Sequence, residues 1–278
     1  MSAQTRDAVF AGSWYPGDPD ELAAVIDDFL SPAVESPRRV TAAVAPHAGV
    51  MHSGPVAGRL FAAIEVPRRV VVLCPNHRDA RPDRPIAAVA PHDAWRTPLG
   101  EIPISRELSE ALVVACPIAG LDAPAHEREH AVELILPFLQ RRRPDLELCA
   151  LTVASTRPED MAVLGAGLAQ LLALDDPPLL VASSDMTHFE PRDVVAAKDR
   201  LAIDRVLDFD PDGLLATCRD HGISMCGRGP TAAILHALRA SGRETYRAEL
   251  VATGHSRSRP GEDSVVGYAS LLLEPVGA

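Results

Sequence analysis

Short apolar runs alternate with longer segments of helical spacing from about residue 40 to the end of this chain. This alternation is typical of buried strands that are each followed by a helix covering the sheet. No Gly/Ser linker, internal repeat or block of like charges interrupts the pattern. We therefore expect one α/β domain over residues 1–278, with a central mixed or parallel sheet and helices on both faces.

The apolar runs and the helical segments predict individual elements. The expected strands are residues 40–45, 69–74, 146–153, 179–182 and 265–273. The expected helices are residues 18–30, 105–115, 125–142, 158–173, 193–207 and 230–240. Asp18 and Pro19 support the start of the first helix, because Asp is a favoured N-cap and Pro fits the first helical position.

The composition excludes several classes of protein. The 278 residues are 47% hydrophobic and 23% charged, which is enough apolar material for a core and argues against disorder. The formal net charge is −11 and no basic stripe is present, so we expect no nucleic-acid partner. No window reaches the roughly 18 apolar residues of a membrane span, and no leader-like segment begins the chain. These features predict a cytoplasmic protein that does not bind a membrane.

The cysteines and histidines differ in what they indicate. The chain has an odd number of cysteines with no C-x-x-C pair, namely Cys74, Cys116, Cys149, Cys218 and Cys226. A disulfide framework is therefore not expected, and most of these residues fit buried core positions. The ten histidines are more informative, because imidazole is both a common metal ligand and a common acid or base.

Three expected strands are each followed closely by a histidine. VTAAVA runs into Pro46-His47, RVVVLC runs into Pro75-Asn76-His77, and PLLVA runs into a segment that ends at His188. Ligands of open α/β sheets bind beyond the carboxyl ends of the strands, so these histidines can share one cleft. One such histidine alone is more often a helix cap or a core residue, but three equivalent positions favour a site.

Cys226 is a fourth candidate. It lies in the glycine-flanked turn Ser-Met-Cys-Gly-Arg-Gly-Pro, just before an expected helix. Backbone N–H groups and the helix dipole favour a thiolate there. Two imidazoles with a thiolate or carboxylate, and with open coordination positions, are typical of a catalytic metal site. A buried cysteine without a chemical role remains the alternative.

The segment His126-Glu127-Arg128-Glu129-His130 matches two zinc-protease signatures, H-E-x-x-H and H-x-x-E-H. Its spacing would put both imidazoles on one face of a helix. The following apolar face lies partly on the other side from His126, and Pro124 puts His126 in a first turn that frays readily. We prefer an amphipathic helix with one inward histidine.

Eight blocks along the chain, in order, resemble the Memo family, whose bacterial and archaeal members are also called AmmeMemoRadiSam system protein B. The blocks are AVFAGSWYPGDPDEL, APHAGVMHSGPVAG, VVVLCPNHR, DAWRTPLGEIPI, EHAVELILPFLQ, SSDMTHF, ISMCGRGPTAA and SVVGYASL. The family is in turn similar in structure to class III (LigB-type) extradiol dioxygenases. The resemblance implies a LigB-type dioxygenase-like fold and spans almost the whole chain.

The resemblance also implies roles for individual residues. His47, His77 and Cys226 would be the metal-binding set, and His188, with Asp185 beside it, would take the place of the general base. His130 and Glu133 would line or support the cleft as part of an E-H-x-x-E block. In the related dioxygenases the metal is Fe(II), which binds a catecholate and O₂.

The sequence departs from those dioxygenases at the metal. Cys226 replaces a carboxylate, and a soft thiolate changes metal preference, so copper and zinc are alternatives to Fe(II). Family members more often have aromatic residues at the positions of Val50 and His52, and a Gln near Ile135. His52 would then add a polar group to the cleft, or it lies in an exposed loop.

Three functions fit these observations. The first is a mononuclear, iron-type site that binds an aromatic or other small molecule and carries out oxygen-dependent chemistry as a non-haem oxidoreductase, with His188 as base. The second is a non-catalytic protein that retains the cleft for a peptide or protein partner. The family's links to peptide binding, and to gene neighbourhoods with AMMECR1-like and radical-SAM proteins, make these the expected partners. The third is a hydrolase with Cys226 as nucleophile and His188 as base.

Overall fold

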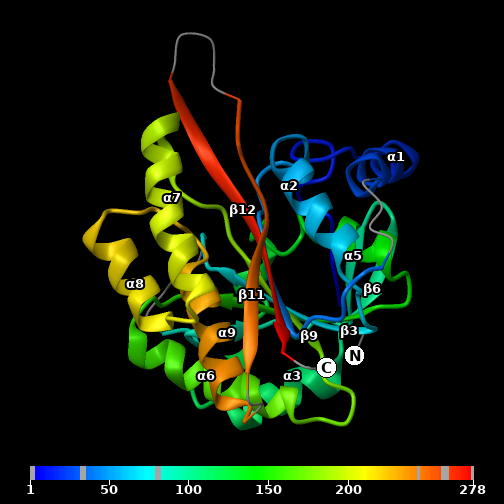
Figure 1. Ribbon diagram of the computed structural model, residues 1–278. Helices are drawn as coiled ribbons and strands as arrows, with labels where there is room; N and C mark the ends of the chain where they lie inside the picture. The colour runs from blue at the N-terminus through cyan, green and yellow to red at the C-terminus, as the bar shows by residue number, and fades with distance from the viewer. Residues whose placement is uncertain (1–3, 32–35, 79–82, 243–244, 258–262, 277–278) are drawn as a thin grey trace.

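The expected apolar runs form the central strands of a large sheet (Figure 1). The computed structural model describes residues 4–31, 36–78, 83–242, 245–257 and 263–276. The five strands predicted from the sequence are β2 (Ala42–Ala45), β3 (Arg69–Pro75), β8 (Glu147–Val153), β9 (Leu179–Ser183) and β12 (Ser264–Pro275). Each lies within three residues of its predicted bounds.

The sheet is mixed, with a parallel centre. In the described parts of the chain it contains nine strands in the order β10-β12-β2-β9-β3-β8-β4-β7, with β11 also paired to β12. Strands β2, β9, β3 and β8 run parallel, while β12 is antiparallel to β2 and β4 is antiparallel to β8. The added strands are β4 (Ala87–Val89), β7 (Ala119–Leu121), β10 (His188–Pro191) and β11 (Tyr246–His255). A small second sheet joins β1 (Thr5–Arg6), β5 (Ala94–Thr97) and β6 (Gly100–Pro103).

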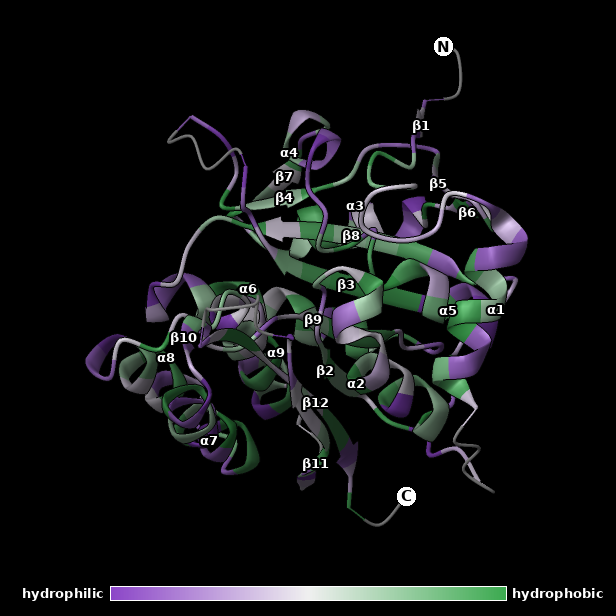
Figure 2. Cartoon of the chain, turned by 90° about the horizontal axis from the view of Figure 1, so that it is seen from above, coloured by the Kyte–Doolittle hydropathy of each residue, from purple (hydrophilic) through white to green (hydrophobic). Residues whose placement is uncertain are grey.

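Helices cover both faces of the large sheet, as the sequence predicts. One face packs against α3 (Arg106–Ala115), α6 (Pro158–Leu172), α7 (Arg192–Leu207), α8 (Pro211–Asp220) and α9 (Arg228–Ala240). The other face packs against α1 (Pro19–Leu30), α2 (Val50–Ala63) and α5 (Leu136–Arg142). Figure 2, seen from above, shows the apolar central strands enclosed between these layers.

Alternate residues of one strand contribute to the two cores. Val71 and Leu73 of β3 pack into the first core, while Val70 and Val72 pack into the second. Successive side chains of a strand point to opposite faces, so a strand covered on both sides must be apolar at every position. This requirement explains why the central strands appear in the sequence as continuous apolar runs.

The helix predicted over residues 125–142 is wrong. The chain instead forms α4 (Pro124–Glu127), a series of turns, and then α5. Glu129 and Glu133, both fully buried, lie between these two helices; Glu129 accepts a hydrogen bond from the backbone N–H of His77, and Glu133 accepts one from that of Phe10. Buried carboxylates must be paired, and their partners lie on other segments of the chain. These tertiary interactions outweigh the helical periodicity of the apolar residues.

Two features of the described residues agree with simpler predictions. Asp18 caps α1 by accepting hydrogen bonds from the N–H groups of Asp20 and Glu21, and Pro19 is its first residue. The cysteines are all free; Cys226 is half-buried and the other four are buried.

Among the described helices, none is both long and apolar enough to cross a membrane.

Candidate functional site

The parallel strands at the centre of the sheet bring three sequence-predicted segments to one edge. β2 pairs with β9 and β9 pairs with β3, all in the same direction. His47 follows the end of β2 by two residues, His77 follows the end of β3 by two, and Ser184 and Asp185 follow β9 directly. The carboxyl end of the sheet therefore carries the candidate residues.

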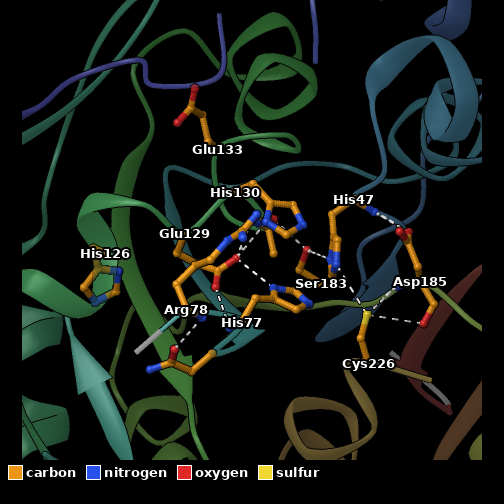
Figure 3. Close-up of polar contacts among 12 residues, drawn as sticks. His47, His77, Arg78, His126, Glu129, His130, Glu133, Ser183, Asp185 and Cys226 are labelled. Atoms are coloured by element: carbon orange, nitrogen blue, oxygen red, sulfur yellow. Dashed lines mark hydrogen bonds and ion pairs between the residues drawn. The ribbon is translucent and has the colours of Figure 1, made fainter. Parts of the chain in front are cut away.

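His47, His77 and His130 form a compact group (Figure 3). Each offers one ring nitrogen, and these three atoms all lie within 4.8 Å of one another. The ring centroids of His47 and His77 are 5.4 Å apart, and those of His77 and His130 are 4.6 Å apart. His47 is 1% exposed and His130 is 8% exposed, whereas the His77 side chain is 26% exposed. The group is thus enclosed on two sides and reaches solvent at His77.

A short hydrogen-bond chain fixes the protonation of His47. Its Nδ1 lies 2.7 Å from Ser183 Oγ, and Ser183 Oγ donates to the carbonyl of Ala131 at 2.7 Å. A hydroxyl has one proton, so Ser183 must accept at its other contact, and His47 Nδ1 therefore carries the hydrogen. Burial also lowers the pKa of His47 to about 3. His47 is neutral near pH 7, with a lone pair on Nε2.

Cys226 lies next to this group on its His47 side. Its Sγ is 3.4 Å from His47 Nε2, and the backbone N–H of Asp185 points to the sulfur at 3.2 Å. Burial raises the pKa of the thiol, and the Asp185 charge adds to this. The turn requires Gly227, since a Cβ there would lie 2.5 Å from the carbonyl oxygen of Ser183. A thiolate at this place needs a neighbouring cation.

Asp185 holds the backbone of the site. Its Oδ1 accepts hydrogen bonds from the N–H groups of His47 at 2.8 Å and Ala48 at 3.2 Å. Burial raises the pKa of Asp185 to about 6, although the hydrogen bond from His47 opposes that rise. The carboxylate therefore orients the loop after β2 through its main chain.

His188 starts β10 and is half-buried. Its Nδ1 lies 3.0 Å from the carbonyl oxygen of Ser224, and its backbone N–H donates to Ser224 Oγ at 2.8 Å. A carbonyl only accepts, so Nδ1 carries the hydrogen and Nε2 has the lone pair. Burial has the largest effect on both neighbours, lowering the pKa of His47 and raising that of Asp185, and the charge of His188 acts to lower both pKa values. His188 is therefore electrostatically coupled to the group.

Glu129 lies against the histidine group, although its residue pattern predicted no role for it. Its carboxylate, fully buried, accepts from the backbone N–H of His77 at 2.8 Å and contacts His77 Nδ1 at 2.9 Å. Burial alone would raise its pKa, but the hydrogen bond and charge of His77 lower that pKa to about 2. Glu129 occurs in the H-x-x-E-H signature and in the E-H-x-x-E block, but neither pattern indicates His77 as its partner.

Glu133 supports the site from outside the histidine group. It is fully buried, forms an ion pair with Arg6, and accepts hydrogen bonds from Tyr15 Oη at 2.6 Å and the Phe10 N–H at 2.8 Å. Arg6 also donates to the carbonyl of Glu129 at 2.7 Å. The N-terminal segment is thus bound to the turns that carry Glu129 and His130.

His126 lies apart from the group, as Figure 3 shows. It is completely buried, and its Nε2 lies 3.0 Å from the carbonyl oxygen of Ala88. Since α4 ends at Glu127, His126 and His130 do not share a helical face. The zinc-protease arrangement is therefore absent from this part of the chain.

A cleft of about 1080 Å³ adjoins the histidines. Ala48 and Gly49, which follow His47, form part of its wall, and His52 on α2 is exposed in it. Its other apolar and aromatic lining residues include Trp14, Met51, Phe189 and Tyr268. The ring of Trp14 lies 4.6 Å from that of His130. The candidate ligands themselves do not line the cleft, which adjoins their group through Ala48, Gly49 and Trp14.

Almost the whole sequence matches a known family. The family model described as Memo-like protein covers residues 6–272. The chain belongs to the Memo family. A MEMO1 family protein of Methanopyrus kandleri is 34% identical over 283 residues, covering 96% of this chain and 98% of its own. A MEMO1 family protein of Methanothermobacter thermautotrophicus is also 34% identical, over 96% of this chain and 99% of its own.

This Memo family chain also shares its fold with a solved structure. The crystal structure of an uncharacterized protein from Escherichia coli K12 superposes with a TM-score of 0.55 and 17% sequence identity. The match covers 84% of this chain and 99% of the Escherichia coli chain. At that identity the likeness concerns the α/β fold alone.

Proposed function

We propose that this Memo family member binds one transition-metal ion at His47 and His77 and uses the adjoining cleft for a small aromatic molecule. The observation that carries the proposal is the group of three ring nitrogens, all within 4.8 Å of one another. Burial lowers the pKa of both His47 and His130 to about 3, so these rings are neutral and can donate lone pairs near pH 7. Unprotonated imidazoles are what metal binding requires.

Two residues compete for the third ligand position. His130 belongs to the group of three nitrogens, and Cys226, favoured by the family resemblance, lies 3.4 Å from His47 Nε2. Nitrogen and sulfur donors select iron, copper or zinc over magnesium or calcium. We propose Fe(II) as the resident ion, with copper and zinc as the alternatives. The half-buried Cys226 thiol, whose pKa is raised, becomes a good ligand when a cation replaces the missing solvation.

The residues around the group have separate tasks in this proposal. The bound metal would supply a site for a phenolic oxygen and for O₂. His188, with its Nε2 lone pair, would accept the proton of the phenol as it binds. Asp185 keeps the His47 backbone in place, and the aromatic wall around Trp14 and Tyr268 holds the ring of the ligand.

Metal content after anaerobic purification tests the site. His47→Ala and His77→Ala should each reduce bound iron to background, while the exposed His255→Ala should bind as wild type does. Comparing Cys226→Ser with His130→Gln then assigns the third ligand, because substitution of the residue that binds the metal should weaken iron binding more. Unchanged iron in His47→Ala would exclude this site.

Oxygen uptake by the iron-loaded protein, with a panel of phenols, tests the chemistry. The enzyme hypothesis predicts uptake that is lost in His188→Ala while bound iron is retained. The main alternative is a binding protein that uses the same cleft for a peptide, and the exposed Met51 and Phe189 at the cleft favour it. Full iron loading without uptake for any phenol would support that alternative.

A further inference from the structure

The carboxylate of Glu129 lies against His77 and His130 and has no exposed surface. An ionised carboxylate in such a place is costly unless hydrogen bonds replace its lost hydration. Glu129 lies in the turns that replace the predicted helix over residues 125–142. The structure therefore departs from helical geometry where it buries this charge.

Both carboxylate oxygens of Glu129 are engaged. Oε2 accepts the backbone N–H of His77 at 2.8 Å. Oε1 contacts His77 Nδ1 at 2.9 Å and accepts the backbone N–H of Ala131 at 2.9 Å. Oε1 also lies 3.3 Å from His130 Nδ1, which makes no hydrogen bond. Glu129 thus holds both the ring and the main chain of His77.

Among the three histidines of the group, His77 depends most on a hydrogen bond to fix the orientation of its ring. Packing restrains the rings of His47 and His130, which are buried, whereas the His77 side chain is 26% exposed. A ring that packing does not enclose can rotate unless a hydrogen bond fixes it. An ionised carboxylate is a stronger acceptor than the hydroxyl that holds His47 or the carbonyl that holds His188.

We infer that Glu129 is the positioning residue of His77: it keeps the hydrogen on Nδ1 and aims the Nε2 lone pair into the histidine group. An outer carboxylate of this kind fixes the tautomer of a ligating imidazole and raises its basicity. The consequence for metal affinity depends on the proposed function. The tautomer of His77 is independent of the proposed function, because Glu129 sets it in the metal-free protein.

The inference is tested first without metal, by ¹⁵N NMR of the histidine side chains near pH 7. The wild-type protein should show His77 as the Nδ1–H tautomer. In Glu129→Gln the side-chain amide has a single acceptor oxygen, so it cannot accept hydrogen bonds at both positions that the carboxylate oxygens occupy. His77 should then become a mixture of tautomers, while His47 keeps its Nδ1–H form. Glu127→Gln is the matched control, since Glu127 is exposed and lies two residues away.

Zinc binding provides the second measurement, with Zn²⁺ alone as the probe. Glu129→Gln should bind zinc about 10- to 100-fold more weakly than wild type, and Glu127→Gln should equal wild type. An Nε2–H tautomer for His77 in the wild-type protein overturns the inference, even if Glu129→Gln does not fold. Equal zinc affinities for Glu129→Gln and Glu127→Gln also overturn it. If the wild type binds no zinc, the proposed metal site fails, and the tautomer measurement alone decides the role of Glu129.

Discussion

The role of each histidine in this chain depends on which group accepts the hydrogen bond from its ring N–H. Ser183 fixes His47 and the Ser224 carbonyl fixes His188, each leaving Nε2 with a lone pair. His126 instead bonds through Nε2 to the carbonyl of Ala88 and belongs to the core. The strand-end position of His47 and His77 was visible in the sequence. The place of His130 within 4.8 Å of them was not, because it depends on the turns before α5.

A pH-dependent stability follows for His126. Burial lowers its pKa from 6.5 to about 4, so the unfolded chain takes up a proton on acidification before the folded protein does. The stability that neutral His126 contributes to the folded protein is complete above pH 6.5, and it is lost as the pH falls towards 4. Between pH 7.5 and pH 5, the loss due to His126 should be about 2 kcal/mol.

Urea unfolding at those two pH values measures this loss. His126→Gln, which cannot titrate, should lose about 2 kcal/mol less stability on acidification than the wild type. His255→Gln, at an exposed position, should behave as the wild type does. Equal acid sensitivity of His126→Gln and wild type would contradict the account of His126 as a buried neutral side chain.

At the level of elements, the turns between α4 and α5 show where local sequence signals fail. The residues 131–140 are all buried, so their apolar spacing carries no information about a single packed face. The deciding interactions are those of Glu129 with His77 and of Glu133 with Arg6 and Tyr15, which are distant in sequence. Periodicity cannot reveal such partners.

The ion pair between Arg6 and Glu133 should stabilise these turns. Glu133→Gln would leave the Arg6 guanidinium, which is 3% exposed, without a charged partner. We expect a loss of about 3 kcal/mol in the free energy of unfolding, as for other buried pairs that lose one member. Chemical denaturation measures it, with Glu127→Gln as the exposed control, and a loss no larger than that of the control would refute the assignment.

At the scale of the whole molecule, the prediction was strongest where burial is complete. The five central strands and the helices on both faces of the sheet were recognisable because a doubly covered sheet must be apolar throughout. The strand β11, with its partly exposed residues, and the helix α2, which contains Pro55, lack such a signature and were not predicted. Parallel pairing of β2, β9 and β3 then places His47 and His77 at one edge. The sequence alone could locate this edge, but it could not show that Glu129 contacts His77, which lies 52 residues away in the chain.

We propose that one metal ion binds at this edge of the sheet. The most direct test of this proposal is a crystal structure of anaerobically purified protein, with the metal assigned by anomalous scattering at the iron, copper and zinc edges. We predict one ion at about 2.0 to 2.1 Å from a ring nitrogen of both His47 and His77, as for imidazole ligands of zinc. A fully metal-loaded protein whose ion lies elsewhere, with both rings unliganded, would contradict the account.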